Sequence, residues 1–188
     1  MKTLVLGMGN TILNDDAIGI IIVRYLSAHF KNEPGIDFKE TSWGGFRIID
    51  LMRGYNYVII IDSIKTGKMY PGFIHHLKTT DLLHTLRLNS YHDINFITAI
   101  KLAEILDEKM PSEMDILAVE VVNNFIITEK LSDEIKDSIY KCSLEILDLL
   151  KTNKIIGNNF NESTFKKIES DIDLKIYYDE EMMSEFTN

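Results

Sequence analysis

The amino-acid sequence predicts an α/β fold with three layers, in which helices cover both faces of a twisted, mostly parallel sheet of about five strands. Three observations predict this class. Strand and helix patterns alternate through residue 150, the first strand ends in a glycine turn, and the run Tyr57-Val58-Ile59-Ile60-Ile61 has no polar face. Continuous hydrophobicity suits a central parallel strand covered on both sides, because a sheet with one face in water alternates apolar and polar residues.

The first half of the chain supplies three predicted strands and two helices. Thr3 to Leu6 is a buried strand closed by the turn Gly7-Met8-Gly9-Asn10. From Asp16 to Phe30, apolar residues recur at helical spacing and predict an amphipathic helix. The remaining elements are a strand at 38–41, a short helix at 46–52 and the apolar strand at 57–61.

The second half continues the pattern. After Pro71-Gly72 we predict a strand at 73–77 on an edge of the sheet, then a helix at 92–106, a strand at 116–121 and a long helix at 131–150 with Ser132 as its cap. We assign residues 1–150 to one α/β domain. Residues 151–188 fall outside the repeat and form a C-terminal extension of unknown role, whose apolar side chains predict that it packs on another surface.

Composition excludes several classes of partner. The chain has 29 acidic and 20 basic residues, a formal net charge of −9, which disfavours nucleic acids and anionic membranes. The sequence shows neither a signal peptide nor an apolar run of the roughly 20 residues that span a bilayer. The single cysteine, Cys142, rules out an internal disulfide and fits a reducing compartment. We therefore expect a cytoplasmic protein without a membrane or nucleic-acid partner, and a monomer, although the residues do not fix the oligomeric state.

Polar residues that follow strands mark the candidate site, because ligands of open α/β sheets bind beyond the carboxyl ends of the strands. Asp15 and Asp16 follow the first strand and its turn, Asp62 follows the apolar strand, and His92 stands at the start of a later helix. Two carboxylates and an imidazole suit a divalent ion such as nickel or zinc and leave positions open. The sequence therefore predicts a metal site at this edge.

Each of these residues also has a structural interpretation. Asp15 or Asp16 can cap the first helix, Asp62 can be a turn residue, and an isolated histidine such as His92 is often a cap or surface residue. We interpret His75, His76 and His84 as structural. A dinucleotide site competes because Gly7 and Gly9 follow the first strand, but Ile12 replaces the third glycine of that fingerprint. The adjacent acids also repel a pyrophosphate.

A family resemblance adds to this interpretation. The run from Gly7 to Gly19 resembles the N-terminal signature of hydrogenase maturation proteases, G-x-G-N-x-x-x-x-D-[DE]-[AG]-x-G. The similarity covers about residues 1–150. Its further matches are Gly44-Gly45, Ile59-Ile60-Ile61-Asp62, Pro71-Gly72, Ser90-Tyr91-His92, Ala118-Val119-Glu120 and Leu131-Ser132.

The resemblance implies an endopeptidase that removes the C-terminal extension from the nickel-loaded large-subunit precursor of a [NiFe] hydrogenase. It implies that Asp16, Asp62 and His92 contact the metal and carry the catalysis, with roles that cannot be separated. Asp16 stands where some members have glutamate. Gly44 and Gly45 are expected in a loop that meets the substrate, although a plain turn is an equal interpretation. The precursor is then the partner and supplies the nickel, and no organic cofactor is needed.

Two other functions remain open at this stage. One is a zinc-type metallohydrolase that carries its own metal, and the other is a nickel-dependent maturation chaperone that cleaves nothing. Cleavage of nickel-loaded and nickel-free precursor separates the three.

Overall fold

A five-stranded sheet with the strand order β2-β1-β3-β5-β4 forms the centre of the molecule. The computed structural model describes residues 1–30, 33–43, 47–78, 100–103, 105–106, 108–157, 160–168, 174–175 and 177–178. Four strands are parallel, namely β1 (Thr3–Met8), β2 (Ile36–Thr41), β3 (Tyr57–Ile64) and β5 (Glu113–Glu120). The fifth strand, β4 (Ile74–Lys78), runs antiparallel to β5 at an edge. The predicted fold class and the edge position of this strand are confirmed.

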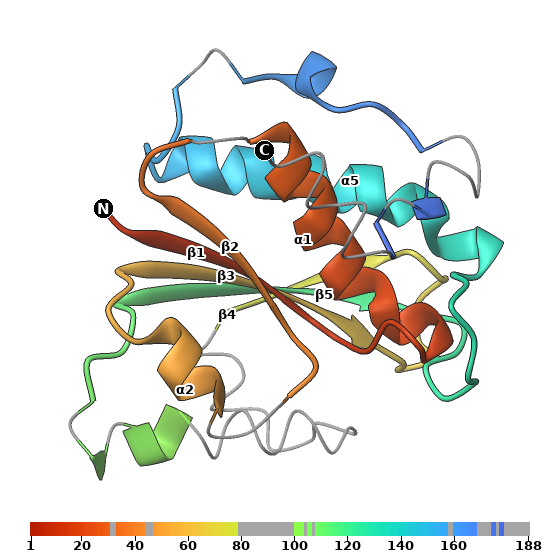
Figure 1. Ribbon diagram of the computed structural model, residues 1–188, viewed down its shortest axis with the longest axis horizontal. Coiled ribbons are helices and arrows are strands. Elements are labelled where there is room, and N and C mark those ends of the chain that lie inside the picture. Colours follow the sequence, from red (N-terminus) through yellow and green to blue (C-terminus); the bar gives the residue numbers. More distant parts are fainter. Residues whose placement is uncertain are drawn as a thin grey trace.

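Helices cover both faces of the sheet (Figure 1). The helices α1 (Ile18–His29) and α5 (Asp133–Thr152) pack on one face, and α2 (Arg47–Met52) with the helical residues 100–103 lies on the other. Side chains of β3 alternate between the two layers: Ile59 and Ile61 join the core beneath α1 and α5, whereas Val58 and Ile60 join the core beneath α2. Because both faces are buried from Tyr57 to Ile61, each fully buried apolar side chain in this part of the strand contributes about 1.5–3 kcal/mol.

Three glycines, which lack side chains, allow the backbone of α1 and of the turn before it to contact the backbone of the sheet directly. A Cβ atom at Gly7 meets the carbonyl oxygen of Gly19, one at Gly19 meets the carbonyl oxygens of Met8 and Ile61, and one at Gly9 meets that of Asp16. All of these contacts are closer than real Cβ atoms come. The glycine spacing therefore serves backbone packing, and it seats the turn that carries Asp16 over the end of β1.

Most predicted elements differ by a few residues from the structure in their bounds, β1 among them, since it continues through Gly7 to Met8, and two further differences concern the candidate site. The 3-10 turn η1 (Asn14–Ala17) precedes α1, so Asp16 belongs to this turn and the helix begins two residues later than expected. β3 continues to Ile64, because the extra residues still pair with β5 and Ile64 lies opposite Glu120. Asp62 is therefore within the strand and does not follow it. Of the helix predicted at 92–106, residues 92–99 and 104 lie outside the described residues.

The chain beyond α5 crosses back over α1 and α5 (Figure 1). The rings of Phe160 and Phe30 lie 4.8 Å apart between centroids, and Phe165 is buried in the same core. Arg24 of α1 binds both carboxylate oxygens of Glu40, at 2.6 and 2.7 Å, and donates to the carbonyl oxygens of Tyr177 and Tyr178. The described residues of the extension pack on the α/β unit, as the apolar side chains predicted.

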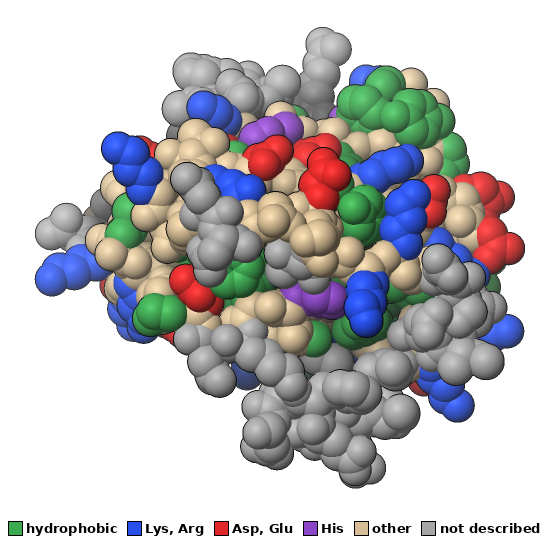
Figure 2. Space-filling view, turned by 90° about the horizontal axis from the view of Figure 1, so that it is seen from above, with side chains coloured by type: hydrophobic (Ala, Val, Ile, Leu, Met, Phe, Trp, Pro, Cys, Tyr) green, Lys and Arg blue, Asp and Glu red, His purple; other side chains and the backbone are tan. Residues whose placement is uncertain are grey.

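The surface carries charges of both signs. On the face seen in Figure 2, Lys and Arg side chains lie among Asp and Glu side chains, so the negative net charge does not gather into one patch there. Within the described part of the chain, every helix is too short or too polar to cross a membrane.

Candidate active site

A small pocket of about 70 Å³ lies at the carboxyl ends of β1, β2 and β3, where the sequence predicted a site. Asp16 enters it from η1 and Asp62 from β3, so the two acids line one cavity although 46 positions separate them in the sequence. The other lining residues are Met8, Gly9, Asn10, Leu13, Thr41, Ser42 and Trp43. A larger cavity of about 350 Å³ shares Asn10, Thr41, Ser42 and Trp43 with this pocket and extends to Arg24, Glu40 and Arg47.

Ser63 fixes the two acids relative to each other. Its backbone N–H donates to Oδ1 of Asp62 at 2.8 Å, and its hydroxyl donates to Oδ1 of Asp16 at 2.7 Å. Successive side chains of a strand point to opposite faces, so Ser63 reaches Asp16 on the side of α1 while Asp62 points to the other side. Sequence reasoning did not identify Ser63; its only signal was its position directly after Asp62.

Asp15, the neighbour of Asp16, is completely buried and has a different role. Its carboxylate accepts hydrogen bonds from the backbone N–H groups of Val122, Asn123 and Ser132 at 2.7–3.1 Å, and from the Ser132 hydroxyl at 3.0 Å. Neither acid caps α1 through its side chain. Ser132 does occupy the N-cap position of α5, but its hydroxyl binds Asp15 instead of capping the helix. The carboxylate of Asp15 also lies at the N-terminus of α5, where the helix dipole stabilises a negative charge.

The remaining predicted site residues, His92, Gly44 and Gly45, lie outside the described residues. Within the parts that the structure describes, no group of three His, Cys, Asp or Glu side chains is placed to hold a metal ion. The structure thus brings Asp16 and Asp62 together, while the metal-binding role of the three residues stays a prediction.

Trp43, at the rim of the pocket, is 63% exposed. The guanidinium of Arg47 lies 5.4 Å from the centre of the Trp43 ring.

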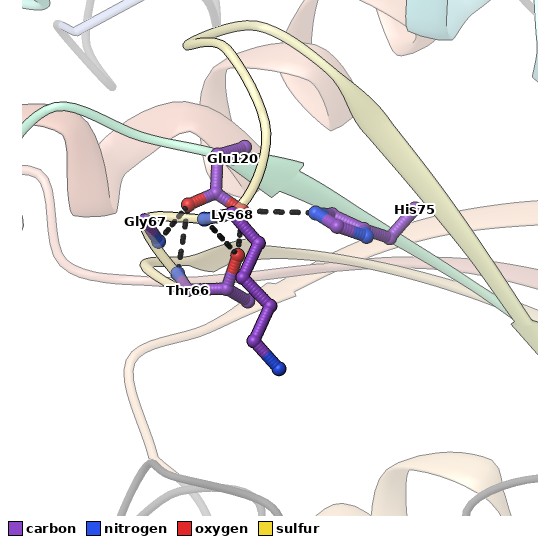
Figure 3. Close-up of polar contacts among 5 residues, drawn as sticks. All are labelled: Thr66, Gly67, Lys68, His75 and Glu120. Carbon is purple, nitrogen blue, oxygen red and sulfur yellow. Dashed lines mark hydrogen bonds and ion pairs between the residues drawn. The ribbon is translucent and has the colours of Figure 1, made fainter.

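Glu120 forms a second polar cluster at the end of β5 (Figure 3). Its Oε1 accepts the backbone N–H groups of Thr66 and Gly67, both at 2.7 Å. Its Oε2 accepts the Thr66 hydroxyl at 2.6 Å and lies 2.9 Å from Nε2 of His75. This one side chain, 2% exposed, therefore ties the loop after β3 to both β4 and β5. His75 acts structurally here, in agreement with its interpretation from the sequence, and His76 similarly contacts Asp115 at 3.0 Å.

The hydrogen bonds to Glu120 affect the pKa of its carboxyl more strongly than burial does. Burial raises the pKa of the Glu120 carboxyl, but the bonds from Thr66, His75 and Gly67 stabilise the carboxylate more, so the pKa lies below its ordinary value. A depressed native pKa contributes stability that is complete above the unfolded pKa, about 4.3, and is lost as the pH falls through the native value.

Replacing Glu120 by glutamine should therefore reduce both stability and its dependence on acid. At pH 7 we expect Glu120→Gln to lower the free energy of unfolding by about 2–3 kcal/mol, because an NH₂ group replaces one of the two oxygens and the hydrogen bonds that this oxygen accepts are lost. As the pH falls from 5 to 3, the difference from the wild type should shrink. Urea unfolding between pH 3 and 7 measures this, with Glu113→Gln on the exposed start of β5 as control. Parallel stability curves for the two proteins would contradict the assignment.

Comparison with known proteins assigns the chain to a family. The model of the family described as hydrogenase maturation protease matches residues 20–149. The chain belongs to the hydrogenase maturation protease family. This confirms the resemblance noted in the sequence, and it does so independently of the glycine signature, because Gly7 to Gly19 precede the matched stretch. The enzyme class named for the family, a protease, is also the one predicted.

Two individual relatives whose names refer to hydrogenases agree with this assignment. The Hydrogenase 2 maturation protease of Escherichia coli is 33% identical over 72 residues, which are 38% of this chain and 44% of that protein. The match therefore spans less than half of this relative. The hydrogenase expression/formation protein HupD of Thiocapsa roseopersicina is 22% identical over 165 residues, or 87% of this chain and 74% of that protein.

Solved structures of hydrogenase maturation proteases share the fold. The hydrogenase maturating endopeptidase HybD from E. coli superposes with a TM-score of 0.67 at 22% identity, covering 81% of this chain and 94% of that one. The [NiFe] hydrogenase maturation protease HybD from Thermococcus kodakarensis gives a TM-score of 0.64 at 26% identity, covering 80% and 99% respectively.

Proposed function

We propose that this family member is an endopeptidase that removes the C-terminal extension from the nickel-loaded large-subunit precursor of a [NiFe] hydrogenase. The observation that carries the proposal is the meeting of Asp16 and Asp62 in one pocket at the carboxyl end of the sheet. Family membership supports it, as do the two relatives, one named for hydrogenase maturation and the other for hydrogenase expression and formation.

The nickel in this proposal belongs to the substrate. Asp16, Asp62 and His92 would contact the ion that the precursor carries, and two carboxylates with one imidazole are a suitable donor set for nickel. A bound divalent ion polarises a carbonyl group or lowers the pKa of a water molecule. Ser63 donates hydrogen bonds from its hydroxyl to Oδ1 of Asp16 and from its backbone N–H to Oδ1 of Asp62. These bonds orient both carboxylates toward the incoming peptide.

The chain's own groups then assist hydrolysis of the peptide bond. Water adds to the scissile carbonyl carbon, a carboxylate of the pocket accepts a proton, and the proton passes to the leaving amine as the C–N bond breaks. Either Asp16 or Asp62 can accept this proton. The adjoining cavity of about 350 Å³, with Arg24, Glu40 and Arg47 in its wall, offers room for residues that flank the cleaved bond. We further propose that the protein acts as a monomer in the cytoplasm, where its single buried thiol, Cys142, stays reduced.

The deciding experiment compares nickel-loaded and nickel-free precursor as substrates of the purified protein. Cleavage of the loaded form alone supports the proposal, because the ion completes the site. Cleavage of both forms instead indicates a metallohydrolase with a metal of its own. Cleavage of neither form, with binding of the loaded precursor retained, indicates a chaperone.

A further inference from the structure

Most of the exposed apolar side chains lie in the loops at the carboxyl end of the sheet. Of the eleven large hydrophobic side chains exposed among the described residues, eight belong to these loops. They are Ile12 after β1, Trp43 after β2, Met69 and Tyr70 after β3, and Val122, Phe125, Ile126 and Ile127 after β5. Since the Asp16–Asp62 pocket opens at the same end, the apolar side chains accompany the candidate active site. Such concentrations on a protein surface mark interaction sites.

The two most exposed of these side chains, Phe125 and Ile127, lie in residues 121–128, which we call the apolar loop. Phe125 is 78% exposed and Ile127 is 81% exposed, and the sequence Val-Val-Asn-Asn-Phe-Ile-Ile-Thr contains no charge. Side chains this exposed contribute little to the core of their own protein. A partner that covered them would gain about 1.5–3 kcal/mol for each side chain that became fully buried.

Hydrogen bonds hold the apolar loop in a fixed shape. The carboxylate of Asp15 accepts the N–H groups of Val122 and Asn123, and Oδ1 of Asn123 accepts those of Phe125 and Ile126 at 2.8 and 3.2 Å. Because the backbone is fixed before any partner arrives, binding through this loop costs little conformational entropy.

The apolar loop is also attached directly to the rim of the pocket. Thr128 donates its N–H to the carbonyl oxygen of Ile12 at 3.0 Å and accepts the N–H of Asn14 at 2.8 Å, so the two loops pair side by side. Ile12 is itself 49% exposed and precedes Leu13, which lines the pocket. Figure 1 shows these segments together at the end of the sheet toward which β1 and β5 run.

We propose that the apolar loop and Ile12 form a docking surface for an uncharged, apolar area on the folded body of the hydrogenase large-subunit precursor. This inference rests on the proposed function. A polypeptide whose scissile bond lies between Asp16 and Asp62 passes over Leu13 and meets Ile12 and the loop beside it. Phe125 and Ile127 stand out from the surface, so they insert into a partner and do not enclose a thin peptide.

Other occupants fit this surface less well. A second copy of the chain docked here would cover the mouth of the pocket and block the substrate. An anionic membrane attracts positive charge, but the residues next to the loop, Glu129 and Lys130, have no net charge and the protein has a net charge of −9. A membrane is therefore a less suitable partner.

The test uses the double variant Phe125→Ser with Ile127→Ser and the precursor encoded in the same genome, loaded with nickel. We expect KM for cleavage to rise about 10–100-fold, because two central apolar contacts are lost, while kcat at saturating precursor stays unchanged. The matched control is Ile105→Ser with Leu106→Ser, which are 78% and 60% exposed but outside these loops, and it should leave KM unchanged. Thermal unfolding verifies that both variants fold.

Binding separates this inference from the proposed function. In the background of Asp62→Ala, the precursor should bind, and Phe125→Ser with Ile127→Ser should weaken that binding by the same factor as KM. An unchanged KM and unchanged binding would overturn the docking proposal even if cleavage proceeds. Binding that depends on the loop without any cleavage by the wild type would overturn only the proposed protease activity. If KM is unchanged but the wild type forms a dimer that the loop variant does not form, a second copy is the occupant and the proposal is overturned. If KM is unchanged but the loop variant loses binding to phosphatidylglycerol vesicles, the occupant is a membrane and the proposal is likewise overturned.

Discussion

Replacing Asp62 by alanine is expected to lower the rate of precursor cleavage by about 10²–10³-fold or more, while the protein stays folded. The carboxylate is half-buried, lines the pocket together with Asp16, and accepts a hydrogen bond from the backbone N–H of Ser63 at 2.8 Å. Its loss removes a group aimed at the reacting centre but leaves the apolar positions of β3 intact. Single-turnover cleavage of nickel-loaded precursor, with urea unfolding of the same protein, measures both effects.

Asp50→Ala provides the control for this experiment. Asp50 lies on α2, its side chain is 69% exposed, and it pairs only with Arg53 among the identified contacts. Its removal should leave the cleavage rate within about twofold of the wild type. If Asp62→Ala cleaves as fast as Asp50→Ala, the pocket between Asp16 and Asp62 is not the place of catalysis.

Asp15→Asn should destabilise the protein by about 3–5 kcal/mol, although the substitution preserves the shape of the side chain. The carboxylate is 0% exposed and accepts four hydrogen bonds, three of them from backbone N–H groups. An amide keeps one acceptor oxygen and turns an NH₂ group toward the remaining donors. Urea unfolding at pH 7 measures the loss, which should also disturb the apolar loop and the start of α5.

The same substitution one residue later should have the opposite profile. Asp16→Asn replaces a carboxylate that is partly exposed in the pocket, so we expect lost cleavage with stability within about 1 kcal/mol of the wild type. The two adjacent acids thus separate folding from catalysis in one matched pair. Equal stability of Asp15→Asn and Asp16→Asn would show that the buried hydrogen bonds of Asp15 do not hold the loop.

Burial patterns explain why much of the fold could be predicted. The run 57–61 has apolar residues at every position, and a strand of that kind is stable only between two covering layers, as β3 is. The proximity of Asp16 and Asp62 followed from the same reasoning, because the ends of neighbouring parallel strands lie at one edge. By contrast, the length of β3 was underestimated, since residues beyond Ile61 are held by pairing with β5 and not by their own hydrophobicity.

The partners of polar side chains could not be predicted in this way. Asp15 binds residues more than 100 positions away in the sequence, and Glu120 joins residues 66, 67 and 75. Arg24, which the helical pattern placed only within an amphipathic helix, donates hydrogen bonds to the carbonyl oxygens of Tyr177 and Tyr178 in the C-terminal extension. Hydrogen bonds of this kind depend on direction and on distances below about 3.2 Å, which residue types and spacing do not specify.

The sequence by itself determined the α/β class, the buried central strand and the presence of acids at the carboxyl end of the sheet. Hydrophobic periodicity and the succession of strands and helices along the chain are enough to predict these features. Only the tertiary structure showed that Asp15 is a buried structural anchor, whereas Asp16, the acid that the family resemblance singled out, lines the pocket. It also decided that an uncharged loop stands exposed beside that pocket. The physical reason is that burial and hydrogen bonding at these positions depend on segments distant in the sequence, which come together only when the sheet and its covering helices have formed.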